Sequence, residues 1–313
     1  MRNTDLKTED IAVTTEHTVP DNYFVKLKTD VVFKKLFGSE ENKHILQAFI
    51  ASLLGIDKSR ISDLTIENTE LPPEFADEKF GRVDIKCLID NSFRINLELQ
   101  ICPYLDYKER SLYYWARMFS IGFRKGREYG ELRETICINI LGFNLFECNE
   151  YHSLFKLRET TRNETLTDKL AIHFYELKKL PPKSPENENN PVLQWLWLIN
   201  AETEEELNMI ANTTVPEIKE AVTIYKHFSQ DEQMRINAFE REMAVLDHAA
   251  ELAASRRIGR EEGRAEGRAE GKAEGVYETA MKALALGKLT IEEISVISGL
   301  PVDKIKEMAS AGK

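Results

Sequence analysis

The segment from residue 82 to residue 101 constrains the fold most, because its apolar side chains fall on every second position. Alternation with period two is typical of strands that bury one face. Asp90, Asn91 and Ser92 separate the two alternating runs and have the chemistry of a turn. The sequence therefore predicts a β-hairpin. Its expected apolar face consists of Val83, Ile85, Cys87, Ile89, Ile95, Leu97, Leu99 and Ile101.

A three-residue loop centred on Asn91 places Asp84 directly opposite Glu98. Opposed side chains have Cβ atoms about 4.5–5.5 Å apart, and like charges at that separation destabilise a sheet. A hard cation between the carboxylates would remove the conflict, since Mg²⁺ is typically held by one or two carboxylates. Two alternatives stay open. A solvated sheet face needs no partner for its charges, and a shift of register by one residue would separate the pair.

The same register places Lys86 opposite Asn96, and it puts Gln100 on the face that carries Glu98. Several other sequence motifs occur in a characteristic order before and after this hairpin, and together they span most of the chain. They are Leu27-Lys28-Thr29-Asp30, Phe33-Lys34-Lys35-Leu36-Phe37, Val83-Asp84-Ile85, Asn96-Leu97-Glu98-Leu99-Gln100, residues 110–117 (RSLYYWAR) and the Gly-Arg-x-Glu repeats after residue 258.

This ordered set resembles the PD-(D/E)XK nuclease superfamily, whose hairpin carries Asp and then Glu-x-Lys. More narrowly it is similar to the Rpn family of recombination-promoting nucleases, in which Gln often occupies the lysine position. The resemblance implies a divalent-metal-dependent phosphodiesterase, with Mg²⁺ or Mn²⁺ held by Asp84 and Glu98. Asp30 matches the acidic residue on the first helix of the family, and it would complete the metal site directly or through water. An ion pair between Asp30 and Lys34 at i+4 is the alternative.

Gln100 departs from the superfamily pattern, because a neutral amide can orient water but cannot offset negative charge in the transition state. Lys86 is our candidate for the missing cation, since it shares the face and lies two residues after Asp84. The alternative is an ordinary solvated lysine on a strand. The predicted catalytic residues are Asp84, Glu98, Gln100, Asp30 and Lys86.

An amphipathic helix is predicted over residues 104–127, with Leu112, Trp115 and Phe119 packing on the sheet. Between Lys108 and Arg127 the chain carries six basic residues and one acid, although its net charge is −11. An acidic protein needs such a local patch to neutralise phosphates, and arginine beside tyrosine can also stack on bases. Pairing of these arginines with acids elsewhere is the open alternative. The predicted nucleic-acid-binding residues are Arg110, Tyr114, Arg117, Arg124 and Lys125.

Helices are expected near 27–37 and 41–54, and a strand is expected near 61–70. The hairpin 80–101 and the helix follow, then a strand at 135–146 and weaker strand candidates at 152–160 and 169–179. This order predicts an α/β fold. The resemblance implies a restriction-endonuclease-like core with a mixed central sheet flanked by helices, followed by an all-α C-terminal region.

The expected organisation is a flexible tail at 1–20, a nuclease-like core at 21–180 and a helical region at 181–255 that follows a proline-rich connection. Residues 256–276 form a Gly/Arg/Glu repeat. Residues 277–313 resemble a small helix-turn-helix module, in which Thr290 and Glu293 are expected to form a capping box and Gly287 and Gly299 are expected to end helices. Glycines at about 0.8–1.0 kcal/mol each and like charges at i, i+4 argue against an isolated helix in the repeat. A partner helix would resolve both, which predicts a homo-oligomer. A flexible spacer is the alternative.

The four cysteines lack CxxC spacing, and no apolar run approaches the length of a membrane span. We therefore expect reduced thiols, a cytoplasmic location and no membrane partner. The first hypothesis is a metal-dependent DNA endonuclease, linked by resemblance to recombination or mobile elements. The second is a non-catalytic DNA-binding or assembly protein with a decayed nuclease core.

Overall fold

The computed structural model describes residues 19–61, 63–71, 81–90, 92–121, 123 and 125–311. The chain divides into two compact units, Met1–Val245 and Leu246–Lys313. The first unit contains a six-stranded mixed sheet with the strand order β1-β4-β5-β6-β8-β7. The β5–β6 and β6–β8 pairs are parallel, and the other pairs are antiparallel. The strands are β1 (Leu64–Glu67), β4 (Ile85–Ile89), β5 (Phe93–Gln100), β6 (Glu134–Leu141), β7 (His152–Phe155) and β8 (Leu170–Glu176).

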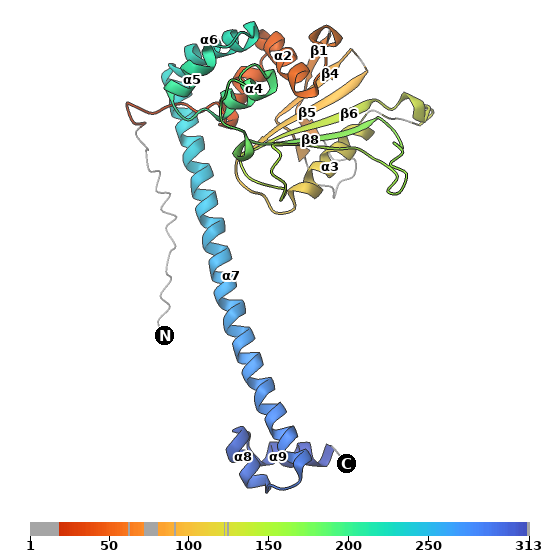
Figure 1. Cartoon of the computed structure of the whole chain (residues 1–313), viewed down its shortest axis with the longest axis vertical. Coiled ribbons are helices and arrows are strands. Elements are labelled where there is room, and N and C mark those ends of the chain that lie inside the picture. Colours follow the sequence, from red (N-terminus) through yellow and green to blue (C-terminus); the bar gives the residue numbers. More distant parts are fainter. Residues whose placement is uncertain are drawn as a thin grey trace, which may run out of the picture. The chain divides into compact units, whose positions relative to one another are not determined.

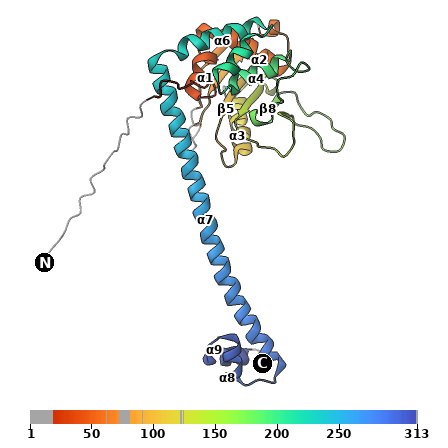
Figure 2. The ribbon, with the colours of Figure 1, turned by 60° about the vertical axis from the view of Figure 1, so that its left-hand side comes forward.

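Helices cover both faces of this sheet, as Figures 1 and 2 show, so the predicted α/β fold with a mixed central sheet is confirmed. One face is covered by α1, α2, α4 and α6, and the opposite face is covered by α3. A separate two-stranded sheet joins β2 (Glu70–Leu71) to β3 (Gly81–Arg82). The helices of this unit are α1 (Asp30–Phe37), α2 (Lys43–Leu54), α3 (Tyr107–Ser120), α4 (Pro191–Asn200), α5 (Glu204–Ala211), α6 (Pro216–Ser229) and the beginning of α7 (Glu232–Leu286).

The predicted hairpin register is confirmed, because Ile85 pairs with Leu97 and Lys86 pairs with Asn96. Asn91, the expected centre of the loop, lies outside the described residues. The predicted strands near 61–70, 135–146, 152–160 and 169–179 are also present, each with shorter bounds.

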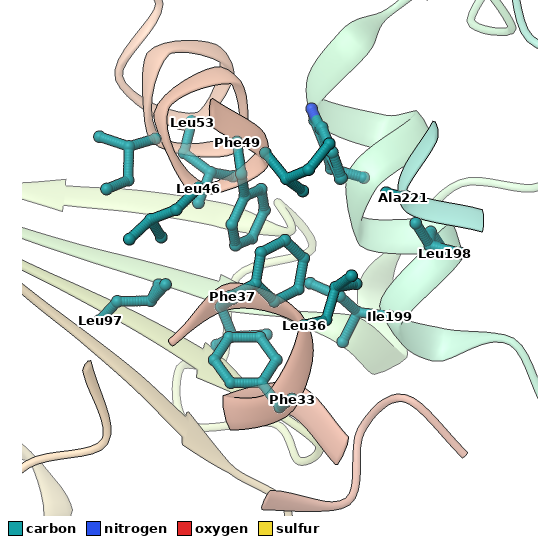
Figure 3. Packing of buried hydrophobic residues seen from close by; sticks show 14 of the residues in the cluster. Phe33, Leu36, Phe37, Leu46, Phe49, Leu53, Leu97, Leu198, Ile199 and Ala221 are labelled. Carbon is teal, nitrogen blue, oxygen red and sulfur yellow. The ribbon is translucent and has the colours of Figure 1, made fainter. Parts of the chain in front are cut away.

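The two faces of β5 have different environments. Ile95, Leu97 and Leu99 enter the main core, where Phe33 and Phe37 of α1 pack beside Leu97 (Figure 3). Phe37 stacks on Phe49 with ring centroids 4.5 Å apart, so aromatic packing fixes α1 on the sheet. The position of α1 in turn places the polar side chains of its other face.

The polar face of the hairpin is buried under α3 and is not solvated. Arg94, Asn96 and Glu98 on β5 are 8%, 1% and 5% exposed, and Lys86 on β4 is 7% exposed. The charges on this face therefore require partners. The solvated-face alternative is thus wrong for Glu98, and so is the picture of Lys86 as a solvated strand lysine. Asp84 is partly buried, with 18% of its side chain exposed.

Helix α3 is shorter than predicted, and its buried residues are Tyr107, Ser111 and Met118. Leu112 is 51% exposed, so its predicted packing on the sheet is wrong. The buried residues are spaced by four and seven positions, which defines one helix face, and Leu112 lies outside it. Trp115 does pack on the sheet, since its Nε1 donates to the Thr135 carbonyl at 2.9 Å.

The second unit confirms the predicted helix stops. Helix α7 ends at Leu286, before Gly287 (φ 60°), and α8 (Ile291–Ser298) ends at Gly299 (φ 78°). Only glycine adopts this backbone conformation readily. The predicted capping box at the start of α8 is formed by Thr290 and Glu293. A small core joins α7, α8 and α9 (Val302–Ala311) through Ala280, Ala283, Ile294 and Ile305.

The Gly/Arg/Glu repeat is helical within α7, contrary to the expectation for an isolated segment. A Cβ atom added at any of its five glycines would meet nothing within 4 Å. Among the described residues, no helix is both long and apolar enough to cross a bilayer.

A histidine pair on β7 and β8 predicts a loss of stability in mild acid. His152 Nε2 lies 3.1 Å from His173 Nδ1. Burial, with the nearby charges of His152 and Lys156, lowers the pKa of His173 from 6.5 to about 4. As the pH falls, His173 is therefore protonated in the unfolded chain at a higher pH than in the folded protein. The free energy of unfolding decreases as the pH falls from 6.5 toward 4. Between pH 7 and pH 5 we expect the wild type to lose up to about 2 kcal/mol more than His173→Gln. Urea unfolding of both proteins at each pH measures this, and equal losses would contradict it.

Candidate functional site

Asp84 and Glu98 lie together at one edge of the sheet, interlocked through the backbone. Asp84 immediately precedes β4, and Glu98 lies near the end of β5. The amide of Asp84 donates to Glu98 Oε1 at 3.3 Å, and the amide of Leu99 donates to Asp84 Oδ2 at 2.9 Å. These hydrogen bonds hold each carboxylate beside the backbone of the opposite strand. The hairpin therefore brings the two predicted acids together.

Burial makes this pair electrostatically unfavourable. Burial, followed by the nearby negative charge of Asp84, raises the pKa of Glu98 to about 8. Tyr107 of α3 covers the site, and burial together with the charge of Glu98 raises its pKa as well. The Tyr107 hydroxyl donates to Asn139 Oδ1 at 3.0 Å, so it is fixed over the sheet. A positive charge placed beside Asp84 would relieve the conflict.

Lys34 supplies such a charge from α1. Its Nζ lies 2.8 Å from Asp84 Oδ1, and its side chain is 38% exposed. Sequence reasoning considered Lys34 only as a partner of Asp30 and missed this contact. The signal available was the position of Lys34 one helical turn after Asp30, a residue already assigned to the site. What was lacking is the packing of α1, which turns Lys34 toward the hairpin.

Asp30 has a different partner. Both oxygens of its carboxylate accept the single N–H of Arg241 Nε in a bifurcated hydrogen bond, at 2.9 and 3.0 Å, and Oδ1 also accepts from the amide of Val31 at 2.9 Å. The alternative ion pair with Lys34 is therefore not formed. Within the described part of the chain, no three His, Cys, Asp or Glu side chains gather closely enough to hold a metal ion. Asp30 thus stands apart from the two carboxylates, and its role as a metal ligand stays a prediction.

The two carboxylates fit a divalent cation nonetheless. Mg²⁺ is usually bound in proteins by one or two carboxylates, with water and substrate phosphate filling the other positions. Glu98 is a buried carboxylate beside a second acid, which is an arrangement that a bound cation stabilises. Asp84 and Glu98 are therefore the residues that would hold the ion.

Gln100 and Lys86 are both committed to backbone contacts. Gln100 Nε2 donates to the Cys102 carbonyl at 3.0 Å, which leaves the amide oxygen as an acceptor. Lys86 Nζ donates to the Asn68 carbonyl at 3.1 Å and lies 3.6 Å from Glu67 Oε2. The Lys86 ammonium thus points to β1, not to the carboxylate pair.

Arg110 of α3 also faces the carboxylates. Its guanidinium lies 5.0, 5.8 and 5.2 Å from the ring centroids of Tyr104, Tyr107 and Tyr114. Desolvation alone would lower its pKa, but the charges of Tyr114 and Glu98 raise the pKa above its usual value. Arginine held by aromatic faces is pre-organised for an anion.

The other residues predicted to bind nucleic acid lie later in the chain, on α3 and in the segment that follows it. Arg117 is partly buried on α3, and Lys125 is exposed after it. Arg124 lies outside the described residues. Nucleic-acid binding by this set stays a prediction.

A family model described as PD-(D/E)XK nuclease family transposase matches residues 27–255, which include α1, the hairpin and α3. Searches of the curated proteins and of the solved structures found no match.

Proposed function

Since this chain belongs to the PD-(D/E)XK nuclease family transposases, we propose that it is a divalent-metal-dependent DNA endonuclease that hydrolyses phosphodiester bonds. The observation that supports this most is the burial of Glu98 beside Asp84. Such a pair weakens a sheet, and a cation bound between the carboxylates would offset that cost. The family description supports a link to DNA recombination or mobile elements.

Each side chain has a defined task in this proposal. Asp84 and Glu98 provide the oxygen ligands for Mg²⁺ or Mn²⁺. When bound, the ion polarises the phosphate and lowers the pKa of a water molecule. Gln100 orients the attacking water through its amide oxygen, because its amide nitrogen is held by Cys102. Arg110 and Tyr114 hold the phosphate backbone beside the carboxylates.

We assign the cationic role, which a motif lysine fills elsewhere in the superfamily, to Lys34. Its ammonium lies against Asp84 and is partly exposed, so it can reach a bound phosphate. Lys86 is 7% exposed and is neutralised by Glu67. A fixed positive charge at this place would stabilise negative charge that develops in the transition state.

Metal binding is tested without any nucleic acid. Titration calorimetry with Mn²⁺ should give a binding isotherm for the wild type that is lost in Asp84→Asn. A variant with the same charge change outside the site, Asp168→Asn, should bind as the wild type does. Equal isotherms for all three proteins would place the metal elsewhere. A wild type that binds DNA but neither binds metal nor cuts would favour a non-catalytic assembly protein, a possibility that Gln100 in place of lysine supports.

We also propose that two copies of the protein associate through α7. Residues 255–275 are exposed along the helix, and Arg260, Arg264, Arg268 and Lys272 form a like-charged row. A second copy could place its glutamate row beside these cations. We expect the sedimenting mass of the full chain to rise with concentration. The change of Arg264, Arg268 and Lys272 to Glu should prevent that rise. A wild type of constant mass would disprove it.

A further inference from the structure

A cavity lies at the C-terminal end of α3, away from the carboxylate pair. Its volume is about 280 Å³, at the small end of the range for ligand pockets. We call it the arginine cavity, because three of the residues that line it are arginines. The lining residues used below are Arg94, Phe119, Phe123, Arg127, Glu131 and Arg133.

The arginine cavity carries more positive charge than its acids neutralise. Arg127 is paired with Glu131 at 2.7 Å. Arg94 is buried, and its nearest acid is Glu67, which lies 3.7 Å from Nε and also serves Lys86. Arg133 has no acidic partner in the described part of the chain. Among the described residues, the cavity therefore contains one cation that no acidic side chain neutralises.

Arg94 and Arg133 also repel each other. Burial lowers the pKa of Arg94; the charge of Glu67 opposes this shift, and the charge of Arg133 adds to it. One nitrogen of Arg94, Nη1, donates to the carbonyls of Met118 and Ile121 at 3.2 and 2.8 Å, which fixes the guanidinium under the end of α3. Its Nε is buried and has no hydrogen-bond partner within the described residues. An anion in the cavity would relieve this repulsion.

Aromatic rings form another part of the wall. Phe119 stacks on Trp115 at 4.8 Å, and Phe123 lies against Tyr129 at 5.4 Å, so neighbouring rings support both. Guanidinium groups bind phosphates, and aromatic side chains stack on bases. The two chemistries occur together in a nucleotide, which carries both groups.

The arginine cavity and the carboxylate pair lie on the same face of the sheet. Arg94 and Glu98 lie on the same face of β5, because they are four residues apart. Their separation along the strand is about 13 Å, which is roughly the length of four base pairs of duplex. A nucleic acid lying along α3 from the carboxylates would therefore reach the cavity.

We propose that the arginine cavity binds one nucleotide of the substrate strand, with its phosphate at Arg133 and its base against Phe123. This inference rests on the proposed function, since it takes DNA as the substrate. The arginine cavity would contact the DNA strand at a nucleotide away from the phosphodiester bond that is cut. Arg94 contributes charge from the wall of the cavity, and Arg133 makes the accessible contact.

The test is DNA binding by the full chain in EDTA, where no cleavage is expected. Fluorescence anisotropy of a short labelled oligonucleotide is measured for the wild type, Arg133→Gln and Arg162→Gln. Arg162 is the matched control, because it loses the same charge and lies at an exposed site beside Glu159 and Glu164. We expect Arg133→Gln to bind about tenfold more weakly at low salt, with the salt slope smaller by about one. Arg162→Gln should behave as the wild type does.

Phe123→Leu tests the base contact separately. It should weaken binding of the oligonucleotide by about tenfold and leave binding of an abasic strand of the same length unchanged. Melting temperatures equal to that of the wild type establish that the variants fold.

Equal affinity of Arg133→Gln and Arg162→Gln for the oligonucleotide would overturn the proposal. If Arg133→Gln lost binding to a free 5′-mononucleotide but bound the oligonucleotide as the wild type does, the assignment to the substrate strand would be overturned. Because cleavage is not measured, the two proposals fail separately. Arg133-dependent binding by a chain that never cuts DNA would reject only the nuclease activity.

Discussion

Glu98→Gln is expected to abolish DNA cleavage and, at the same time, to stabilise the fold. The substitution keeps the shape of the side chain but replaces a buried acid with a neutral amide; the pKa of about 8 means that Glu98 must take up a proton in the metal-free fold at neutral pH. Loss of a metal ligand should lower the cleavage rate by at least about a thousandfold. Because an amide needs no proton to be buried, the substitution should raise the free energy of unfolding at neutral pH by about 1–3 kcal/mol. Plasmid nicking and calorimetric melting measure the two effects.

Glu109→Gln is the matched control for this change. Glu109 is exposed on α3, so the same loss of charge should alter neither the rate nor the melting temperature. A Glu98→Gln protein that cuts as fast as the wild type would rule out Glu98 as a ligand. A protein that is inactive and strongly destabilised would indicate that Glu98 is needed for the fold, since its Oε1 accepts from the Asp84 amide.

Lys34→Met is expected to lower cleavage by about a hundredfold to a thousandfold, and Lys86→Met should leave most of it. Methionine retains much of the apolar stem of lysine, so the change removes mainly the charge. The Lys34 ammonium lies 2.8 Å from Asp84 Oδ1, whereas the Lys86 ammonium is held by Glu67 and Asn68. Single-turnover nicking rates at saturating metal separate this effect from a change in metal affinity.

Lys34→Arg should recover part of the activity, because it restores the charge with a different geometry. The reverse pattern, with Lys86→Met inactive and Lys34→Met active, would return the cationic role to Lys86. Loss of activity in both variants with unchanged melting temperatures would mean that the site needs both cations.

The local part of this structure could be predicted from the sequence. Period-two alternation and the turn residues at 90–92 gave the hairpin register, which the pairing of Ile85 with Leu97 confirms. Both signals lie within twenty residues of chain. The capping box at Thr290 and the stop at Gly299 are similarly local, and both are present.

The long-range partners could not be predicted in this way. Lys34 meets Asp84 only because Phe33 and Phe37 fix α1 on the sheet. Arg241 reaches Asp30 from a helix that begins about two hundred residues later. Charge patterns in sequence favour neighbours three or four positions away, so these pairs leave no local signal.

Helix phase and helix stability were the other sources of error. Helix α3 has apolar or aromatic residues on more than one face, so periodicity did not decide between Leu112 and Met118. In the repeat of α7, the cost of glycine suggested that an isolated helix would not form. Alanine, arginine and glutamate between the glycines are strong helix formers, and the segment is helical.

The most direct test of the central claim is nicking of supercoiled plasmid by the wild type and Glu98→Gln, purified identically, with Mg²⁺, Mn²⁺ or EDTA. The account predicts nicking by the wild type with either metal, none in EDTA, and none by the variant under any condition. Nicking by the variant at the rate of the wild type, or nicking that persists in EDTA, would contradict it.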